Sequence, residues 1–333
     1  MGHQNPDALS VAHFTRSDRH PTYPFMSASP DSMLPPEIRK HYPFASRFVR
    51  VNGHRMHYVD EGEGDPVLLL HGNPTWSFLY RKFIPLLVAA GHRVIAPDHI
   101  GFGLSDRPAR EHDFSLENHI ANLAEFIRRL GLKRTTVVCQ DWGGPTGLAC
   151  AMLDPAAFKG VVVMNTWAWP EPTEFHGSVF PWRMMHAPVV APYLFQRRNI
   201  LVERGLYLSV VHRQRFLEEA LPAYRFVTPD YDSRLLTRVF PRLIPLRPDD
   251  RSAATMRWLE QSLRNSAIPA LIVWGKEEIV FPAACAQRFK TLLPHAQGPL
   301  WVTGSHFLQE DSPQEICAHI RDFLSGLDGG RQS

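Results

Sequence analysis

The stretch VVCQDWGGPTG, residues 137–147, decides the fold class of this chain. It begins as a run of β-branched and small apolar residues and then breaks into Gln140-Asp141-Trp142-Gly143-Gly144. This pattern predicts a strand that turns sharply into a helix. Asp141 occupies the turn, where enzymes with this strand–turn–helix arrangement present a serine nucleophile. A carboxylate at that place indicates a nucleophile suited to a different bond. The alternative role for Asp141 is a plain N-cap of the helix.

Short apolar runs alternate with helix-like segments on both sides of this stretch. Strands are expected at 67–70, 93–97, 135–139, 160–164, 270–274 and 299–302, and helices at 78–90, 116–130, 145–153, 253–265, 283–292 and 313–324. Alternating segments around Asn52-Gly53 predict a hairpin ahead of them. The order predicts an α/β fold, in which helices flank a mostly parallel central sheet on both faces.

Residues 168–250 interrupt this alternation. A break of roughly 80 residues is too long for a loop in a compact domain, and the segment is rich in Pro, Trp, Met, Phe and Arg. We therefore expect it to form an inserted helical cap, with residues 44–167 and 251–327 as the core. Residues 1–43 are rich in Pro, Ser, His and Asp without a sustained period, which predicts a loosely ordered N-terminal extension.

Composition indicates a soluble globular protein rather than a nucleic-acid or membrane protein. The net charge of the 333 residues is only +3 and the basic residues are scattered, which argues against both kinds of partner. No apolar signal segment occurs in residues 1–30, and the most apolar later stretch, 178–194, contains Arg183 and three prolines. Four cysteines lie far apart without a C-x-x-C pair, which is typical of reduced thiols in a cytoplasmic protein: Cys139, Cys150, Cys285 and Cys317.

Two further strand ends carry groups that suit catalysis. Ligands gather at the carboxyl ends of parallel strands. The segment GSHFLQEDSP, residues 304–313, places His306 after the last strand, and VWGKEEIVFP, residues 273–282, places Glu277 and Glu278 after an earlier one. We expect His306 to act as a general base and one glutamate to orient its ring. The alternatives are a surface or core histidine and exposed loop acids.

A fourth segment supplies hydrogen-bond donors. LLLHGNPTWSFLYR, residues 68–81, leaves a strand and turns at His71-Gly72-Asn73-Pro74. The main-chain N–H groups of Asn73 and Trp142 are candidates for an oxyanion hole. Their side chains, an amide and an indole, are donors as well. The alternatives are a turn-forming asparagine and a core tryptophan.

Together these motifs closely resemble the haloalkane dehalogenases of the α/β-hydrolase superfamily. The motifs are His71-Gly72-Asn73-Pro74, Asp141-Trp142-Gly143-Gly144, GSHFLQEDSP and APDHIGFGLSDRP at 96–108, and the resemblance spans roughly residues 43–325. It implies an α/β-hydrolase fold with a cap, and a halide held by the side chains of Asn73 and Trp142. It also implies a small apolar halogenated substrate and a reaction without cofactor or metal. No H-E-x-x-H, P-loop or G-x-G-x-x-G motif contradicts this.

The resemblance departs from some family members at the orienting acid. Where those members carry it, after the strand ending at Met164, this chain has uncharged Asn165 and Thr166. It resembles instead the branch whose acid follows a later strand. The spacing from Gly275 puts Glu278 in that register, with Glu277 as the reserve.

The expected reaction cuts a carbon–halogen bond. Asp141 displaces the halide and forms an ester, and His306 then activates a water that hydrolyses this ester to a primary alcohol. A serine would leave an ether, which could not be hydrolysed.

Three alternatives remain open at this point. The segments RLIPLRPDDR at 242–251, PHAQ at 294–297 and MNT at 164–166 also resemble β-lactone decarboxylases of olefin biosynthesis. An epoxide hydrolase would use the same Asp and His but needs acidic cap groups, for which four tyrosines are candidates: Tyr193, Tyr207, Tyr224 and Tyr231. A non-catalytic receptor on the same fold is the third alternative.

Overall fold

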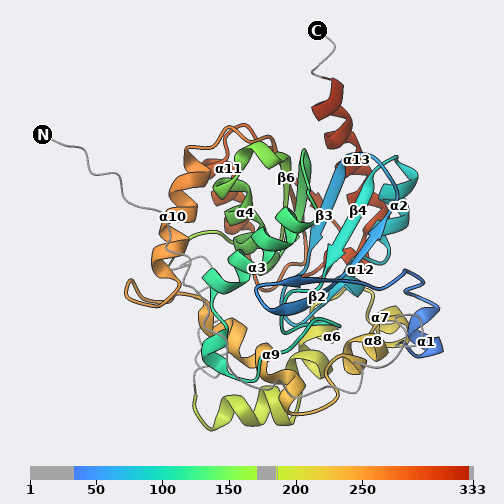
Figure 1. The fold of residues 1–333 in the computed structure, drawn as a ribbon, viewed down its shortest axis with the longest axis vertical. Coiled ribbons are helices and arrows are strands. Elements are labelled where there is room, and N and C mark those ends of the chain that lie inside the picture. The colour runs from blue at the N-terminus through green and yellow to red at the C-terminus, as the bar shows by residue number, and fades with distance from the viewer. Residues whose placement is uncertain (1–33, 171–184, 186, 330–333) are drawn as a thin grey trace, which may run out of the picture.

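The computed structural model describes residues 34–170, 185 and 187–329 (Figure 1). Its centre is an eight-stranded sheet in the order β1-β2-β4-β3-β5-β6-β7-β8. The first two strands, β1 (Arg47–Val51) and β2 (His54–Glu61), form the expected hairpin around Asn52-Gly53, and β2 pairs antiparallel with β4. Every later pair in this sheet is parallel. The prediction of a mostly parallel α/β sheet is confirmed.

The remaining elements of the sheet layer follow the expected alternation closely. The strands are β3 (Pro66–Leu70), β4 (Arg93–Pro97), β5 (Thr135–Gln140), β6 (Phe158–Met164), β7 (Ala270–Gly275) and β8 (Gln297–Val302). The helices are η3 (Ser77–Tyr80), α2 (Phe83–Ala89), η4 (Glu111–Asp113), α3 (Leu116–Arg129), α4 (Gly143–Leu153), η5 (Pro155–Ala157), α10 (Ala253–Arg264), α11 (Ala283–Leu292), α12 (Leu308–Asp311) and α13 (Pro313–Gly329). The helix expected over 78–90 is in fact two helices, η3 and α2, separated at residues 81–82.

Helices cover both faces of the sheet, so its central strands have no polar face. In β5, Val137 and Cys139 pack into the hydrophobic cluster that contains Leu123 of α3, whereas Val138 packs into the opposite cluster with Ile320 of α13. Successive side chains of a strand point to opposite faces, which explains why residues 137–139 in the middle of β5 form a continuous apolar run. Figure 1 shows α3, α4, α10 and α11 on one side of the sheet and α2 and α13 on the other.

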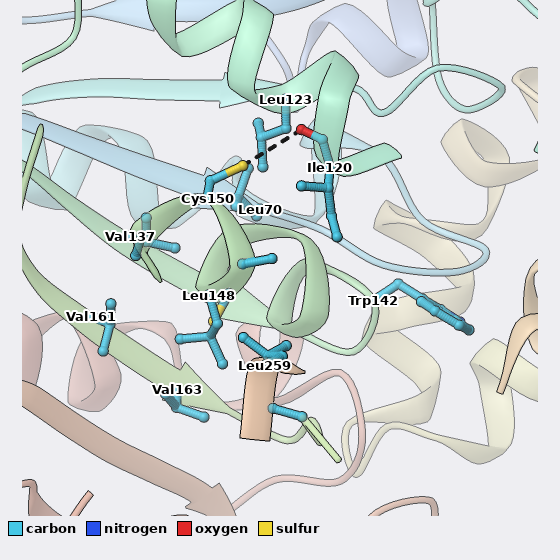
Figure 2. Close-up of a cluster of buried hydrophobic side chains, with 14 of the residues drawn as sticks. Leu70, Ile120, Leu123, Val137, Trp142, Leu148, Cys150, Val161, Val163 and Leu259 are labelled. Carbon is cyan, nitrogen blue, oxygen red and sulfur yellow. Dashed lines mark hydrogen bonds between the residues drawn. The ribbon is translucent and has the colours of Figure 1, made fainter. Parts of the chain in front are cut away.

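The cluster under α4 holds the strand–turn–helix unit in place. Figure 2 shows Leu148 of α4 close to Val161 and Val163 of β6, with Cys150 directed toward α3. The Cys150 thiol contacts the carbonyl oxygen of Ile120 at 3.6 Å. All four cysteines are buried, and none of them forms a disulfide.

The structure corrects the expected start of the ordered chain. Residues 34–43, assigned from the sequence to the loose extension, include helix α1 (Pro36–Arg39). Leu34, Ile38 and Tyr42 of this segment are buried. The Tyr42 ring packs 5.1 Å from that of Trp76, and its hydroxyl bonds to Ser77 Oγ at 2.6 Å. Because Pro and charged residues dominate this segment, its three apolar residues form no periodic pattern in the sequence. Their burial becomes visible only in the folded core. Residues 1–33 lie outside the described residues.

Short helical segments lie in the described part of the chain between β6 and β7, where the cap is expected. They are η7 (Pro192–Arg197), η8 (Leu201–Gly205), α6 (Leu206–Leu208), α7 (Arg213–Glu219), α8 (Leu221–Phe226), η9 (Asp232–Arg234), α9 (Leu235–Val239) and η10 (Phe240–Leu243). Figure 1 shows α6, α7, α8 and α9 together beyond one end of the sheet. Residues 171–184 and 186 of the expected cap lie outside the described residues, and its boundaries stay a prediction.

Membrane-spanning helices and metal-binding clusters are both absent from the described residues. None of their helices is both long and apolar enough to cross a membrane. Among the same residues, no group of three or more His, Cys, Asp or Glu side chains is arranged to hold a metal ion.

Three neutral imidazoles are buried beside the ends of β3 and β4. The rings of His71 and His99 lie 4.8 Å apart, and those of His99 and His119 lie 6.1 Å apart. The main-chain N–H of His99 donates to His71 Nε2 at 3.0 Å, while both ring nitrogens of His119 are buried without a partner. Burial lowers the pKa of His71, holds that of His99 well below its usual value, and lowers the pKa of His119 to about 3.

We expect this histidine cluster to make the fold sensitive to acid. Below pH 6.5 the unfolded chain protonates position 119, but the folded protein does not until the pH approaches about 3, so the free energy of unfolding falls through this window. The loss from His119 should be about 1.4 kcal/mol per pH unit. In His119→Leu, the drop in stability between pH 6.5 and 5, measured by urea unfolding, should shrink by about 2 kcal/mol. Exposed His112→Leu is the matched control, and equal slopes for all three proteins would contradict the expectation.

Candidate active site

Asp141 lies on a tight left-handed turn between β5 and α4. Its φ is +51°, a conformation that non-glycine residues seldom adopt and that needs support from neighbours. Its main-chain N–H donates to the carbonyl oxygen of Asn165 at 3.0 Å, and its own carbonyl accepts from Gly144 N–H at 2.9 Å and from the Thr166 hydroxyl. The turn therefore aims the carboxyl group away from the strand.

Three glycines leave room for this turn. A Cβ atom at Gly72 would overlap the Asp141 carboxylate, one at Gly143 would overlap the Leu70 carbonyl, and one at Gly144 would overlap the Thr166 hydroxyl. The glycines of the two sequence motifs are thus required by close packing around Asp141.

Two main-chain N–H groups hold the Asp141 carboxylate. Asp141 Oδ1 accepts from the N–H of Asn73 at 2.7 Å, and the N–H of Trp142 also donates to the carboxylate. Burial raises the pKa of Asp141, while the nearby His306 ring and these two donors oppose that shift. The donors expected to form an oxyanion hole therefore already bond to the carboxylate of the buried side chain.

His306 stands between two carboxylates. Its Nε2 lies 3.7 Å from Asp141 Oδ2, and its Nδ1 lies 3.1 Å from Glu278 Oε2. Burial favours the neutral ring, but Glu278 first and Asp141 next outweigh it, so the pKa of His306 is raised. The side chain is 5% exposed, which keeps these interactions away from bulk water.

The two candidate glutamates separate clearly. Glu277 is exposed, and its Oε2 accepts from the main-chain N–H of Gly304 at 2.8 Å. Glu278 is buried at 2% exposure, and its second oxygen accepts from the main-chain N–H groups of Val280 and Phe281. Those two bonds fix the carboxylate that contacts His306, so the extra methylene of Glu relative to Asp does not prevent the contact.

The donor side chains of Asn73 and Trp142 face the segment between β6 and β7, where the cap is expected. Asn73 Nδ2 lies 3.4 Å from the carbonyl oxygen of Thr237 in α9, and its Oδ1 is buried without a partner. The indole of Trp142 packs edge-on against Trp167 and Phe240, each with ring centroids 4.7 Å away. Both residues thus adjoin Asp141 through their main chain and contact the segment between β6 and β7 through their side chains.

Sequence reasoning assigned no role to two polar residues of the site. The Asn165 side chain accepts from Gly275 N–H at 3.0 Å and donates to the carbonyl oxygens of Ser305 and His306 at 2.9 and 3.2 Å. Gln140 places its Nε2 3.1 Å from His306 Nε2. The available signal was a polar residue directly after three or more consecutive apolar residues of a strand, a place where burial needs hydrogen-bond partners.

Comparison with known proteins places this geometry in a family. Residues 65–313 match the family model described as alpha/beta hydrolase fold. Over 281 residues the chain is 38% identical to haloalkane dehalogenase 2 from Mycobacterium tuberculosis, which covers 84% of this chain and 94% of that protein. The chain belongs to the haloalkane dehalogenase family.

A second relative and a solved structure extend this result. This chain is also 33% identical over 286 residues to the cis-3-alkyl-4-alkyloxetan-2-one decarboxylase of Shewanella oneidensis. The match covers 85% of this chain and 89% of that protein. The structure of this chain is similar to the crystal structure of haloalkane dehalogenase DbeA from Bradyrhizobium elkani, with a TM-score of 0.80 and 27% identity over 86% and 99% of the two chains. The expected α/β-hydrolase fold and the resemblance to this family are confirmed.

Both carboxylates next to His306 should have a measurable effect on the pKa of its ring. Because each raises the pKa of His306, Glu278→Gln and Asp141→Asn should each lower it, and Glu278→Gln should lower it more. Nitrogen NMR of the labelled imidazole measures this pKa directly. Glu277→Gln is the matched control and should leave it unchanged. An unshifted pKa in Glu278→Gln would show that the contact does not persist in solution.

Proposed function

We propose that this protein hydrolyses carbon–halogen bonds of small apolar haloalkanes, giving an alcohol, a halide ion and a proton. The observation that supports this most is the buried Asp141 carboxylate. Its Oδ1 accepts from the main-chain N–H of Asn73, the main-chain N–H of Trp142 also donates to the carboxylate, and its Oδ2 lies 3.7 Å from His306 Nε2. Membership of the haloalkane dehalogenase family points to the same reaction.

In the first step Asp141 acts as the nucleophile. Its Oδ2, the oxygen that lies 3.7 Å from His306 Nε2, attacks the halogen-bearing carbon, and the halide leaves with the bonding electron pair. The Asn73 amide and the Trp142 indole are the donors that stabilise the charge on the departing halide. The step needs no base, because the nucleophile reacts as the carboxylate.

In the second step His306 acts as the general base. Nε2 takes a proton from a water whose oxygen adds to the carboxyl carbon of Asp141, and the negative charge moves to Oδ1. The N–H groups of Asn73 and Trp142 stabilise that oxyanion, while Glu278 stabilises the imidazolium. The alkoxide then leaves and takes the proton from His306. The new carboxyl group of Asp141 releases its own proton to the solvent, so both side chains return to their starting states.

An isotope experiment tests the covalent route. During a single turnover of a bromoalkane in ¹⁸O water, the water oxygen should enter the Asp141 carboxylate and the alcohol should remain unlabelled, because its oxygen comes from Asp141. Mass spectrometry of the peptide containing residue 141 measures the label, and Asp141→Asn is the control that should release no bromide. Alcohol that carries the label after one turnover would exclude the ester.

The Shewanella relative favours a second candidate, decarboxylation of a four-membered lactone to an alkene. The same nucleophile would open the strained ring, and the Asn73 and Trp142 donors would face the displaced oxygen. The epoxide alternative has less support among the described residues: Tyr193 and Tyr231 are exposed, Arg213 lies over the Tyr207 ring, and the Tyr224 hydroxyl bonds to buried Glu310.

A paired assay separates the two candidate reactions. We expect purified protein to release bromide from 1-bromoalkanes and to form little alkene from a cis-3,4-dialkyl oxetan-2-one. Halide titration and gas chromatography of the headspace measure the two products, with Asp141→Asn as the control for both. Alkene formation without bromide release would overturn the proposal in favour of the lactone reaction.

A further inference from the structure

Gln140 is the last residue of β5 and contacts the proposed base directly. Its side chain is fully buried, and its Nε2 lies 3.1 Å from His306 Nε2 and 3.2 Å from the His306 carbonyl oxygen. An amide nitrogen donates two hydrogen bonds and accepts none. Gln140 therefore donates to the ring nitrogen, and that nitrogen must carry a lone pair.

The other side of the ring fixes the same tautomer. His306 Nδ1 faces Glu278 Oε2 at 3.1 Å, and an ionised carboxylate only accepts, so the proton of the neutral ring is on Nδ1. Asp141 Oδ2 lies 3.7 Å from Nε2, too far for a hydrogen bond. In the resting enzyme the lone pair of the base is thus bonded to Gln140 rather than to the nucleophile.

The oxygen of the same amide has no partner. Gln140 Oε1 is buried without a hydrogen bond, an arrangement that is costly and calls for an explanation. A half-turn of the terminal amide exchanges its oxygen and nitrogen. The His306 carbonyl would keep a donor after such a turn, because Asn165 Nδ2 also bonds to it at 3.2 Å.

We propose that Gln140 is a positioning residue that keeps His306 neutral until the ester has formed, and that its amide then turns to accept a hydrogen bond from the protonated ring. The idea rests on the proposed two-step reaction. In the resting state the Asp141 carboxylate favours protonation of the His306 ring. A protonated ring could not act as a base, and it would hold the nucleophile in an ion pair. The Gln140 donor opposes this, because it bonds only to the neutral ring.

In the second step the oxygen of the same Gln140 amide acts as a hydrogen-bond acceptor. Esterification removes the charge of Asp141, and Nε2 then takes a proton from water while the water oxygen bonds to the carboxyl carbon. The new Nε2–H needs an acceptor, and the turned Gln140 oxygen supplies one. The charged groups that face the ring are Asp141 and Glu278, and the Phe281 and Phe307 rings cover it with centroids 5.5 and 4.7 Å away.

Gln140→Met tests both ends of the amide, because it keeps the length and removes the donor and the acceptor. In the free enzyme the pKa of His306, measured by nitrogen NMR, should rise by about one unit, since the neutral ring loses its donor while Asp141 still stabilises the cation. In rapid-mixing experiments with a bromoalkane, the bromide burst should persist above that pKa, and ester hydrolysis should slow by about tenfold.

Two further variants separate this role from a structural one. Gln140→Glu restores an acceptor only, so at pH values above the His306 pKa of each variant it should hydrolyse the ester faster than Gln140→Met. Gln309→Met is the matched control, because Gln309 of α12 is equally buried and has no hydrogen bond to His306. It should change neither the pKa nor the ratio of the two rates.

Equal slowing of burst and hydrolysis in Gln140→Met, or an unchanged His306 pKa, would overturn the role of Gln140. Failure of the proposed function looks different. In that case the wild-type protein releases no bromide from any bromoalkane, while the effect of Gln140→Met on the His306 pKa remains measurable and still decides whether the amide holds the neutral ring.

Discussion

The pair of main-chain N–H bonds to Asp141 is the interaction on which this site depends. A carboxylate buried to this degree is costly unless donors compensate for the lost water. Here the compensation comes from the backbone of Asn73 and Trp142, which no side-chain substitution removes. It requires β3 and β5 to be neighbours and Gly72 to let the chain pass against the carboxyl group. The pairing of β3 with β5 in the parallel sheet therefore places the donors that make a buried carboxylate stable among apolar strands.

Polar side chains at the strand ends keep the reacting groups in register. Asn165 after β6 links the Asp141 turn, Gly275 at the end of β7 and the His306 loop through its carbonyl, its amide oxygen and its amide nitrogen. Its neutral side chain thus ties these three segments together. Glu278 then supplies the charge from the next strand along the sheet.

The His306 loop is also anchored to the segment between β6 and β7. The Asp311 carboxylate accepts from the main-chain N–H groups of Val211 and His212, and from that of Ser305. Next to it, Glu310 forms a buried ion pair with Arg81 at 2.5 Å. Loss of one partner from such a pair leaves an uncompensated buried charge. Helix α12 therefore couples the position of the proposed base to the elements expected to cover the site.

The sequence by itself determined the order of strands and helices, the strand-to-helix turn at Asp141, and the set of four strand ends that carry polar groups. Those features are local, because periodicity and glycine placement act over a few residues. Only the tertiary structure decided which glutamate meets His306, that Gln140 and Asn165 bond to the His306 loop, and that residues 34–43 pack into the core. These depend on contacts between residues 28 to 166 positions apart, or on three buried residues in a polar segment. Such contacts through space leave no periodic pattern along the chain.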